Sequence, residues 1–126
     1  MTSGVILDAG ALIALERSDR QVLRILDLAH AELATVTVPA GAFAQVIRDP
    51  ARQVRLSRLL RRRSTSVVGL DQDDATVVGR ALAASGTSDV VDAHVVVCAQ
   101  RAGQAVVTSD PDDLRRIDPT LRLITI

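Results

Sequence analysis

The sequence predicts an α/β fold in which a central, mostly parallel sheet of about five strands is flanked by helices. Short apolar runs rich in β-branched residues alternate with longer segments of helical periodicity, and this alternation is typical of parallel sheets with right-handed crossovers. The 48% hydrophobic content suits a compact globular chain. No repeat, low-complexity tract or linker divides the chain, so we expect residues 1–126 to form a single domain.

The first half of the chain supplies two strands and two helices. Residues 5–7, Val-Ile-Leu, are a short apolar run and form the first predicted strand. Helical patterns follow at residues 11–16 and 20–31, the second with apolar residues at helical spacing. Residues 35–38 form the second strand, which we expect to stop at Pro39 because proline cannot donate a hydrogen bond to a sheet ladder.

Two more helices and a third strand follow. The first helix is predicted over residues 41–48, and the second begins at Pro50 and extends to about Arg62, since proline is favoured in the first turn. This second helix carries leucines on one face and arginines on another. The third strand is predicted at residues 66–68.

The last part of the chain continues the alternation with two helices and two strands. A helix capped by Asp71 extends through Ala84 and ends at Gly86. The next helix is apolar nearly all round between residues 90 and 99, so we expect it to be buried centrally. We expect Ser88 to cap this helix, which extends to Arg101 and ends at Gly103. The last two strands are predicted at residues 105–108 and 121–126.

The charge composition limits what the protein can bind. The formal net charge is +0, which argues against a general nucleic-acid coat protein. All 15 basic residues are arginine, and six of them fall within residues 52–63. Phe43 is the single aromatic residue, so the protein does not bind nucleic acid by stacking bases on aromatic rings.

The sequence predicts a cytoplasmic protein with no membrane association. No apolar run approaches the roughly 20 residues that span a bilayer, and no secretory signal is visible at the N-terminus. Cys98 is the single cysteine and lies in an apolar run, so we expect a buried structural thiol.

Acidic residues stand where predicted apolar elements meet their connections. Asp8 follows the first strand, Asp89 and Asp92 lie in the first turn of the buried helix, and Asp110 follows the fourth strand. Because the C-terminal ends of parallel strands share one edge of a sheet, we expect these side chains to meet. Carboxylates brought that close repel one another unless a cation holds them, and oxygen ligands suit Mg²⁺ or Mn²⁺.

Each of these aspartates, taken singly, also suits a purely structural role. Helix capping or interaction with a helix dipole explains each aspartate on its own. These roles account less well for the fact that all of them lie where predicted elements end, at one edge of the sheet. A phospho-acceptor receiver domain and a P-loop NTPase both need a lysine, and the chain has none. His30 and His94 lack the spacing of zinc ligands, and His94 suits a core or interface position.

Three segments resemble the PIN-domain ribonucleases, and within them the VapC-type toxins of bacterial toxin–antitoxin pairs. They are residues 5–14 around Asp8, residues 92–99 beginning with Asp92, and residues 107–110 ending with Asp110. The resemblance covers nearly the whole chain. It implies a three-layer PIN-like fold and a metal-dependent endoribonuclease that is the toxin of a type II pair. It further implies a homodimer that is silenced by a cognate antitoxin.

This function, combined with the acidic pattern, leads to expected roles for individual residues. Asp8, Asp92 and Asp110 are the expected catalytic residues and ligands of Mg²⁺ (or Mn²⁺), with Asp89 in or next to the metal shell. Thr108 and Ser109 are expected to orient Asp110 by hydrogen bonding, and Asp113 to keep the site acidic. The candidates for binding the phosphates of the RNA substrate are the helical arginines Arg55, Arg58 and Arg62.

One position departs from the family pattern. The family commonly has a glutamate in the helix after the second strand, and the matching residue here is Gln45. An amide can coordinate a metal through its carbonyl oxygen, but it brings no charge and is no base. The alternative function is therefore a catalytically impaired PIN-fold module that binds RNA or an antitoxin without turnover. A metal-dependent phosphatase or DNA nuclease is a third hypothesis, based on the carboxylate chemistry alone.

Overall fold

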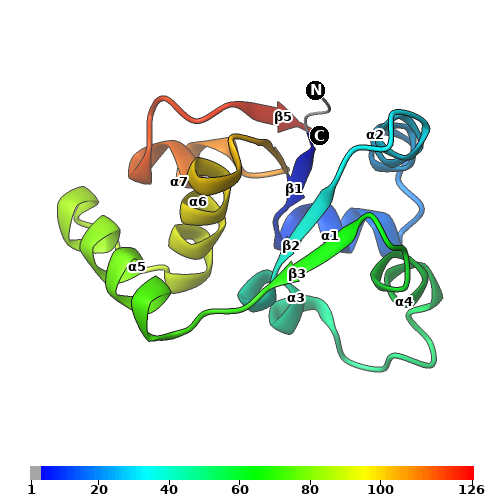
Figure 1. Cartoon of the computed structure of the whole chain (residues 1–126), viewed down its shortest axis with the longest axis horizontal. Helices are drawn as coiled ribbons and strands as arrows, with labels where there is room; N and C mark the ends of the chain where they lie inside the picture. The colour runs from blue at the N-terminus through cyan, green and yellow to red at the C-terminus, as the bar shows by residue number, and fades with distance from the viewer. Residues whose placement is uncertain (1–3) are drawn as a thin grey trace.

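The computed structural model describes residues 4–126, with a five-stranded sheet at its centre (Figure 1). Every pair of neighbouring strands is parallel, and the strand order is β3-β2-β1-β4-β5. The predicted α/β class and parallel sheet are confirmed. The strands are β1 (Val5–Leu7), β2 (Val36–Pro39), β3 (Thr65–Val68), β4 (Ala105–Thr108) and β5 (Leu123–Thr125).

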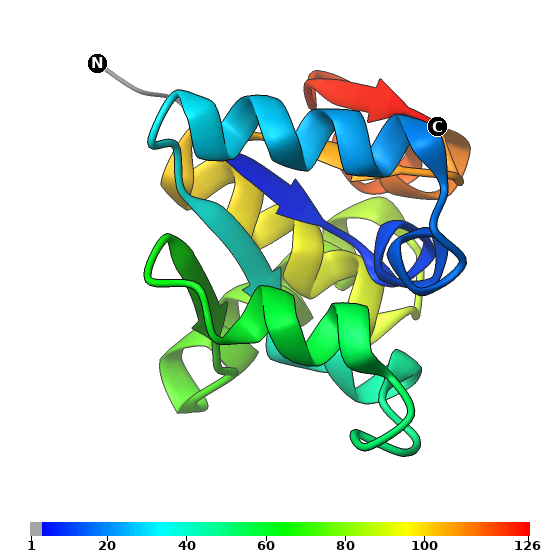
Figure 2. The ribbon, with the colours of Figure 1, turned by 90° about the vertical axis from the view of Figure 1, so that its right-hand side faces the viewer.

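Seven helices among the described residues cover the sheet on both faces. α1, α2 and α4 lie on the side that Figure 2 presents to the viewer, and α6 lies behind the sheet against β1, β2 and β4. α3 contacts both α1 and α6, while α5 and α7 pack on α6. The helices are α1 (Ala9–Glu16), α2 (Arg20–Ala31), α3 (Ala40–Val46), α4 (Val54–Leu60), α5 (Gln72–Ser85), α6 (Val90–Ala102) and α7 (Pro111–Ile117).

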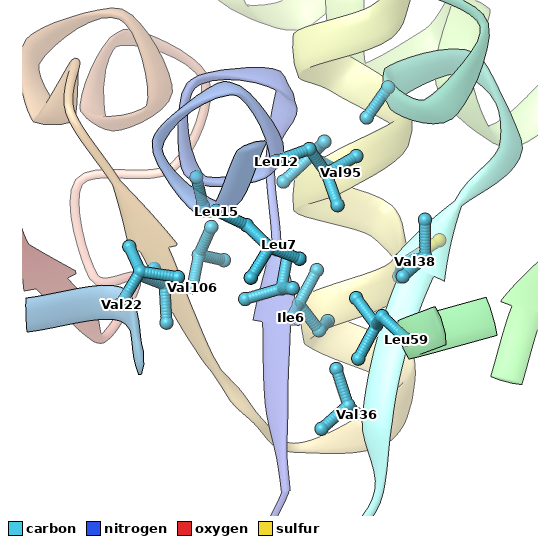
Figure 3. Packing of buried hydrophobic residues seen from close by; sticks show 14 of the residues in the cluster. Ile6, Leu7, Leu12, Leu15, Val22, Val36, Val38, Leu59, Val95 and Val106 are labelled. Carbon is cyan, nitrogen blue, oxygen red and sulfur yellow. The ribbon is translucent and has the colours of Figure 1, made fainter. Parts of the chain in front are cut away.

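The central strand β1 is buried between the two helical layers. Ile6 and Leu7 are both 0% exposed, and Figure 3 shows them in one cluster with Leu12 of α1 and Val95 of α6. Truncation of such a fully buried leucine typically costs about 2–5 kcal/mol of stability, because a cavity remains. β1 is thus held rigidly, and the position of the residue that follows it is fixed by the core.

The buried helix α6 behaves as its composition predicts. Every residue from 93 to 99 is buried. Cys98 is among them, and burial raises the pKa of its thiol to about 11, so the thiol stays protonated at neutral pH. The helix ends at Gly103, whose backbone is left-handed (φ 64°), and α5 ends in the same way at Gly86 (φ 69°).

The predicted start of α4 is wrong by four residues. We expected the helix to begin at Pro50, but residues 50–52 form a turn and α4 begins at Val54. The reason is the side chain of Gln53, whose Oε1 accepts hydrogen bonds from the amides of Arg48 (2.7 Å) and Asp49 (3.0 Å). These bonds satisfy the backbone in a turn and remove the need for an earlier helical start.

Smaller differences occur at other element ends. Pro39, expected to stop β2, is its last residue, because a strand end tolerates a missing donor. The cap of α6 is Asp89 rather than Ser88, since the Asp89 Oδ1 accepts from the amide of Asp92 (2.9 Å). β5 is shorter than the predicted 121–126 because a turn closes between Leu121 and Asp118.

Within residues 4–126, no single helix is long and apolar enough to cross a membrane. The pair α5 and α6 reaches the required length and composition only when both helices are counted together across a 108° bend.

Candidate functional site

Two neighbouring strands bring acidic residues to the same edge of the sheet. β1 and β4 pair in parallel, with Leu7 opposite Val107, so the residues that follow them emerge side by side. Asp8 follows β1 directly, and its amide donates a hydrogen bond to the carbonyl of Val107 (3.3 Å). Asp110 follows β4 after one intervening residue. The predicted convergence of strand ends therefore occurs here.

Asp8 is the most buried of these carboxylates. Its side chain is only 6% exposed, and its Oδ1 caps α1 by accepting from the amide of Ala11 (2.9 Å). Burial raises the pKa of Asp8, while hydrogen bonds from the Thr108 side chain and from the amides of Ala11 and Gly10 act in the opposite direction. The net effect is a raised pKa, as expected for a carboxylate that lacks a cationic partner.

The pKa of Asp92 is affected by burial and by four other carboxylates. Its pKa is raised from 3.8 to about 6, first by burial and then by the negative charges of Asp89, Asp113, Asp8 and Asp110, in that order. No arginine is among the charges that shift it. Four carboxylates, from the ends of β1 and β4 and the starts of α6 and α7, thus act on Asp92. We call these residues and Asp92 the acidic edge.

Asp110 is linked to its surroundings at two points. Its amide donates to the hydroxyl oxygen of Thr108 (2.9 Å), so Thr108 contacts the backbone of Asp110 and the side chain of Asp8. A side-chain hydrogen bond with Asp113 is the main cause that raises the pKa of Asp110, followed by burial and by the charges of Asp113, Asp112 and Asp8. The carboxyl of Asp110 caps no helix and remains exposed.

The hydroxyl of Ser109 does not make the hydrogen bond to Asp110 that we expected. No hydrogen bond from its hydroxyl to Asp110 occurs in the structure of residues 4–126. The hydroxyl instead fills the space beside Gly10, where an added Cβ would collide with it. The same Cβ position is 3.5 Å from the Oδ1 of Asp8. Sequence reasoning missed this arrangement, and the signal for it was a glycine two residues after the first acidic position.

An open pocket of about 340 Å³ borders the acidic edge on the α6–α7 side. Asp89, Asp92 and Asp113 line it together with Arg116. Arg116 is 3.7 Å from Asp113, and both side chains are well exposed. Such an exposed pair contributes little to stability, and one arginine does not balance the formal charges of five aspartates.

The donors of the acidic edge fit a hard divalent cation by their chemistry, although they are not gathered around one point. Among the residues the structure describes, no group of three or more acidic, histidine or cysteine side chains lies close enough together to hold a metal ion. Asp8 and Asp89 each have one oxygen bound to a backbone amide. All the donors are oxygens, as Mg²⁺ and Mn²⁺ prefer.

Gln45 does not join this group by any hydrogen bond within residues 4–126. It is exposed on α3, a helix that packs against α1 and α6, the two helices that Asp8 and Asp89 cap. The neutral amide adds no charge to the acidic edge.

The arginines expected to bind RNA phosphates lie in another place. Arg55, Arg58 and Arg62 line a groove of about 180 Å³ between α2 and α4, together with Asp27 and His30. We call these five residues the arginine groove. None of the three arginines is among the charges that shift the pKa values of Asp8, Asp92 and Asp110. The structure therefore does not bring them to the acidic edge.

Comparison with known proteins identifies a family and several similar folds. The family model of the PIN domain matches residues 5–119. The crystal structure of VapBC2 from Rickettsia felis, bound to a DNA fragment from its promoter, contains a chain with a TM-score of 0.70 and 16% identity, over 97% of this chain and 98% of that one. The structure of FitAB bound to an IR36 DNA fragment contains a chain with a TM-score of 0.68 and 14% identity, over 96% of this chain and 94% of that one.

A third structure, FitAcB from Neisseria gonorrhoeae, gives a TM-score of 0.66 and 15% identity, over 96% of each chain. At these identities the three structures establish a shared fold. Comparison of the sequence with those of curated proteins finds no significant match.

Proposed function

Because the chain belongs to the PIN-domain family, we propose that it is a metal-dependent endoribonuclease and the toxin of a type II toxin–antitoxin pair. PIN domains are generally nucleases. The observation that carries the proposal is the convergence of five carboxylates at one edge of the sheet, where burial and then the charges of the other four raise the pKa of Asp92 to about 6. Perturbed carboxylates gathered at one edge are typical of a functional site, and here they suit a cation that would balance their charge.

The fold neighbours support the toxin assignment. VapBC2 and FitAB are toxin–antitoxin complexes, and both were solved with DNA fragments. We propose a cognate antitoxin as protein partner, RNA as substrate, a homodimer as the working form, and a single PIN-like domain over residues 1–126.

In the proposed mechanism, Asp8, Asp92 and Asp110 would hold Mg²⁺ or Mn²⁺, with Asp89 beside them. The bound cation supplies a Lewis acid that offsets the negative charge of the phosphodiester and makes water a stronger nucleophile. Asp8 is held in place by the amide of Ala11, which fixes one of its two oxygens. Thr108 holds the backbone of Asp110. These contacts set the carboxylates before substrate arrives, which lowers the reorganisation needed.

The alternative proposal is a binding module without turnover, and Gln45 is the observation that favours it. A carboxylate at that exposed position of α3 would add a further negative charge near the start of α1 and α6, whereas the amide adds none. We favour the active enzyme because Asp89 and Asp113 already contribute charge at Asp92.

A side-by-side assay tests the proposal. Purified protein is incubated with single-stranded RNA, DNA of the same sequence and a phosphomonoester, each in Mg²⁺, Mn²⁺ or EDTA. We expect cleavage of RNA alone and only with a metal. Cleavage of DNA or of the monoester at a similar rate would replace the assignment with a nuclease or phosphatase of broader substrate range. Binding of RNA without cleavage in any metal would favour the binding module.

A further inference from the structure

A second groove begins at the acidic edge and follows α1. It has a volume of about 430 Å³ and is lined by Gly10, Ile13, Ala14, Arg17, Asp19 and Ser109. We call these six residues the α1 groove. Gly10 lies two residues after Asp8, and Ser109 directly precedes Asp110. The groove therefore opens directly onto the carboxylates.

The sequence of α1 explains the shape of this groove. Positions 10, 13, 14 and 17 lie on one face of a helix, because residues three, four and seven apart are neighbours on its surface. The residues nearest the acidic edge are small, and Ile13 is 40% exposed. Arg17 lies seven residues beyond Gly10, about 10 Å along the helix axis. The groove therefore has an end lined by small residues at the carboxylates and a cationic end at Arg17.

The end of the groove beside the carboxylates carries a hydroxyl group. Because Gly10 has no Cβ, the Ser109 hydroxyl occupies the space that a side chain would fill. That space lies 3.5 Å from the Oδ1 of Asp8, and the hydroxyl has no hydrogen-bond partner among residues 4–126 that would hold it elsewhere. A hydroxyl in this position can donate to an oxygen of a molecule in the groove.

The cationic end is available for an anion. Arg17 is exposed and takes part in no ion pair with a described residue. Its neighbour Asp19 is engaged in capping α2, with its Oδ1 accepting from the amide of Val22 (3.1 Å). Arg116, on the other side of the acidic edge, is 3.7 Å from Asp113. The arginine groove holds more cations but borders none of the five carboxylates.

We propose that the α1 groove binds the RNA strand on one side of the cleaved phosphodiester. The Ser109 hydroxyl donates to a phosphate or ribose oxygen next to the acidic edge, and the Arg17 guanidinium binds a phosphate farther along the strand. The exposed side chain of Ile13 lies between them and contacts the sugar. A polyanion that crosses an acidic edge needs such a cation close by, because the carboxylates repel its phosphates. This inference rests on the proposed RNA substrate.

Arg17 is tested by the salt dependence of RNA binding. Binding of a fluorescein-labelled single-stranded RNA is followed by anisotropy in EDTA, where no metal supports cleavage, for wild type, Arg17→Gln, Arg58→Gln and Arg80→Gln. Arg80 is an exposed arginine on α5 and is the matched control. We expect Arg17→Gln to weaken binding about tenfold and to reduce the slope of log Kd against log salt by about 0.7, the value for one phosphate contact on a single strand.

The outcomes of this experiment separate the proposal of an RNA-binding α1 groove from the proposal of a nuclease. Weakening by Arg58→Gln but not by Arg17→Gln would place the strand in the arginine groove and overturn the inference. Equal effects of Arg17→Gln and Arg80→Gln would overturn it too, as would the absence of RNA binding by wild type in EDTA. The proposed function is tested separately, by RNA cleavage in Mg²⁺. If RNA binds through Arg17 but is never cut in metal, the groove stands and the nuclease proposal fails.

The contact between Gly10 and Ser109 is tested by a double-mutant cycle on RNA cleavage in Mg²⁺. Gly10→Ala fills the space and displaces the hydroxyl, and Ser109→Ala removes it. Each variant is therefore expected to lower kcat/KM about tenfold, and the double variant no further, because both changes remove the same contact. Thermal melts check that all three variants fold. Losses that multiply, or a loss confined to Ser109→Ala, would contradict the proposed position of the hydroxyl.

Discussion

The acidic edge and the arginine groove are the two regions that the sequence marks by charge, and their ionisable groups are shifted in opposite ways. At the acidic edge burial and neighbouring carboxylates raise the pKa of Asp92, and burial raises that of Asp8. In the arginine groove burial and the charge of Arg62 lower the pKa of His30, with Asp27 acting against them. The acidic edge would gain from an added cation, whereas the arginine groove disfavours one.

The difference shows how each region is built. Strands β1 and β4 are neighbours in a parallel sheet, so the topology itself brings Asp8 and Asp110 together. The arginines lie on one face of α4, and where that face points depends on how the helix docks against its neighbours. The place of charge at strand ends therefore follows from the sheet topology, whereas the place of charge on a helix face does not.

The largest expected effect comes from Asp8. The change Asp8→Asn keeps the helix cap, since asparagine caps as well as aspartate, but removes one charge from the proposed metal site. We expect RNA cleavage in Mg²⁺ to fall on the order of 100-fold or more. The control is Asp27→Asn in the arginine groove, which makes the same chemical change and should leave the rate within about twofold. Equal rates for Asp8→Asn and wild type would show that the acidic edge is not the active site.

Asp89 and Gln45 distinguish the active enzyme from the binding module. If the amide is tolerated, Asp89→Asn should reduce cleavage about as much as Asp92→Asn, on the order of 10- to 100-fold. Asparagine again preserves the cap on the Asp92 amide. The rates of RNA turnover are compared for wild type, Asp89→Asn, Asp92→Asn and Gln45→Glu. An inert wild type together with an active Gln45→Glu would favour the binding module instead.

Metal should stabilise the native protein through the acidic edge. At a metal concentration ten times the Kd, binding to the folded state alone adds about 1.4 kcal/mol, which raises Tm by about 3–6 °C. The melting temperature is measured with Mg²⁺ or Mn²⁺ and with EDTA. Asp92→Asn should abolish most of the shift and Asp27→Asn should keep it. A shift of the same size in Asp92→Asn would locate the metal elsewhere.

The pH dependence of stability should separate the two regions. Asp92 has a folded pKa of about 6, above its ordinary value of 3.8. Its contribution to folding stability is therefore fully present below pH 3.8 and is lost as pH rises through 6. In EDTA at pH 7, Asp92→Asn should therefore be more stable than wild type by about 1 kcal/mol, a figure reduced from the full shift because the group is only half-buried. Denaturant melts measure the difference, and the two proteins should converge near pH 4.

His30 should respond in the opposite sense. Its folded pKa is lowered, so its contribution to stability is present above its ordinary value of 6.5 and is lost as pH falls below that value. Denaturant melts of His30→Gln and wild type between pH 4 and 8 measure this loss, which should be absent in the variant. Parallel curves for the two proteins would show that protonation of His30 does not affect folding.

Some features followed from the sequence because they are local or topological. The alternation of strands and helices predicts the parallel sheet, and the continuous apolar run of α6 predicts its burial. The start of α4 did not follow, because the side chain of Gln53 satisfies the preceding turn and only the folded chain places it there. The Ser109 hydroxyl beside Gly10 likewise depends on two segments that are distant in sequence and adjacent in the sheet.

The most direct test of the proposed metal site is a crystal structure of the protein soaked in Mn²⁺, with anomalous data collected to locate the ion. We expect one or two Mn²⁺ ions at the acidic edge, bound by Asp8, Asp92 and Asp110, with the carboxylates drawn closer together than in the metal-free protein. Mn²⁺ bound at another place, or an acidic edge free of anomalous density at millimolar Mn²⁺, would contradict the assignment.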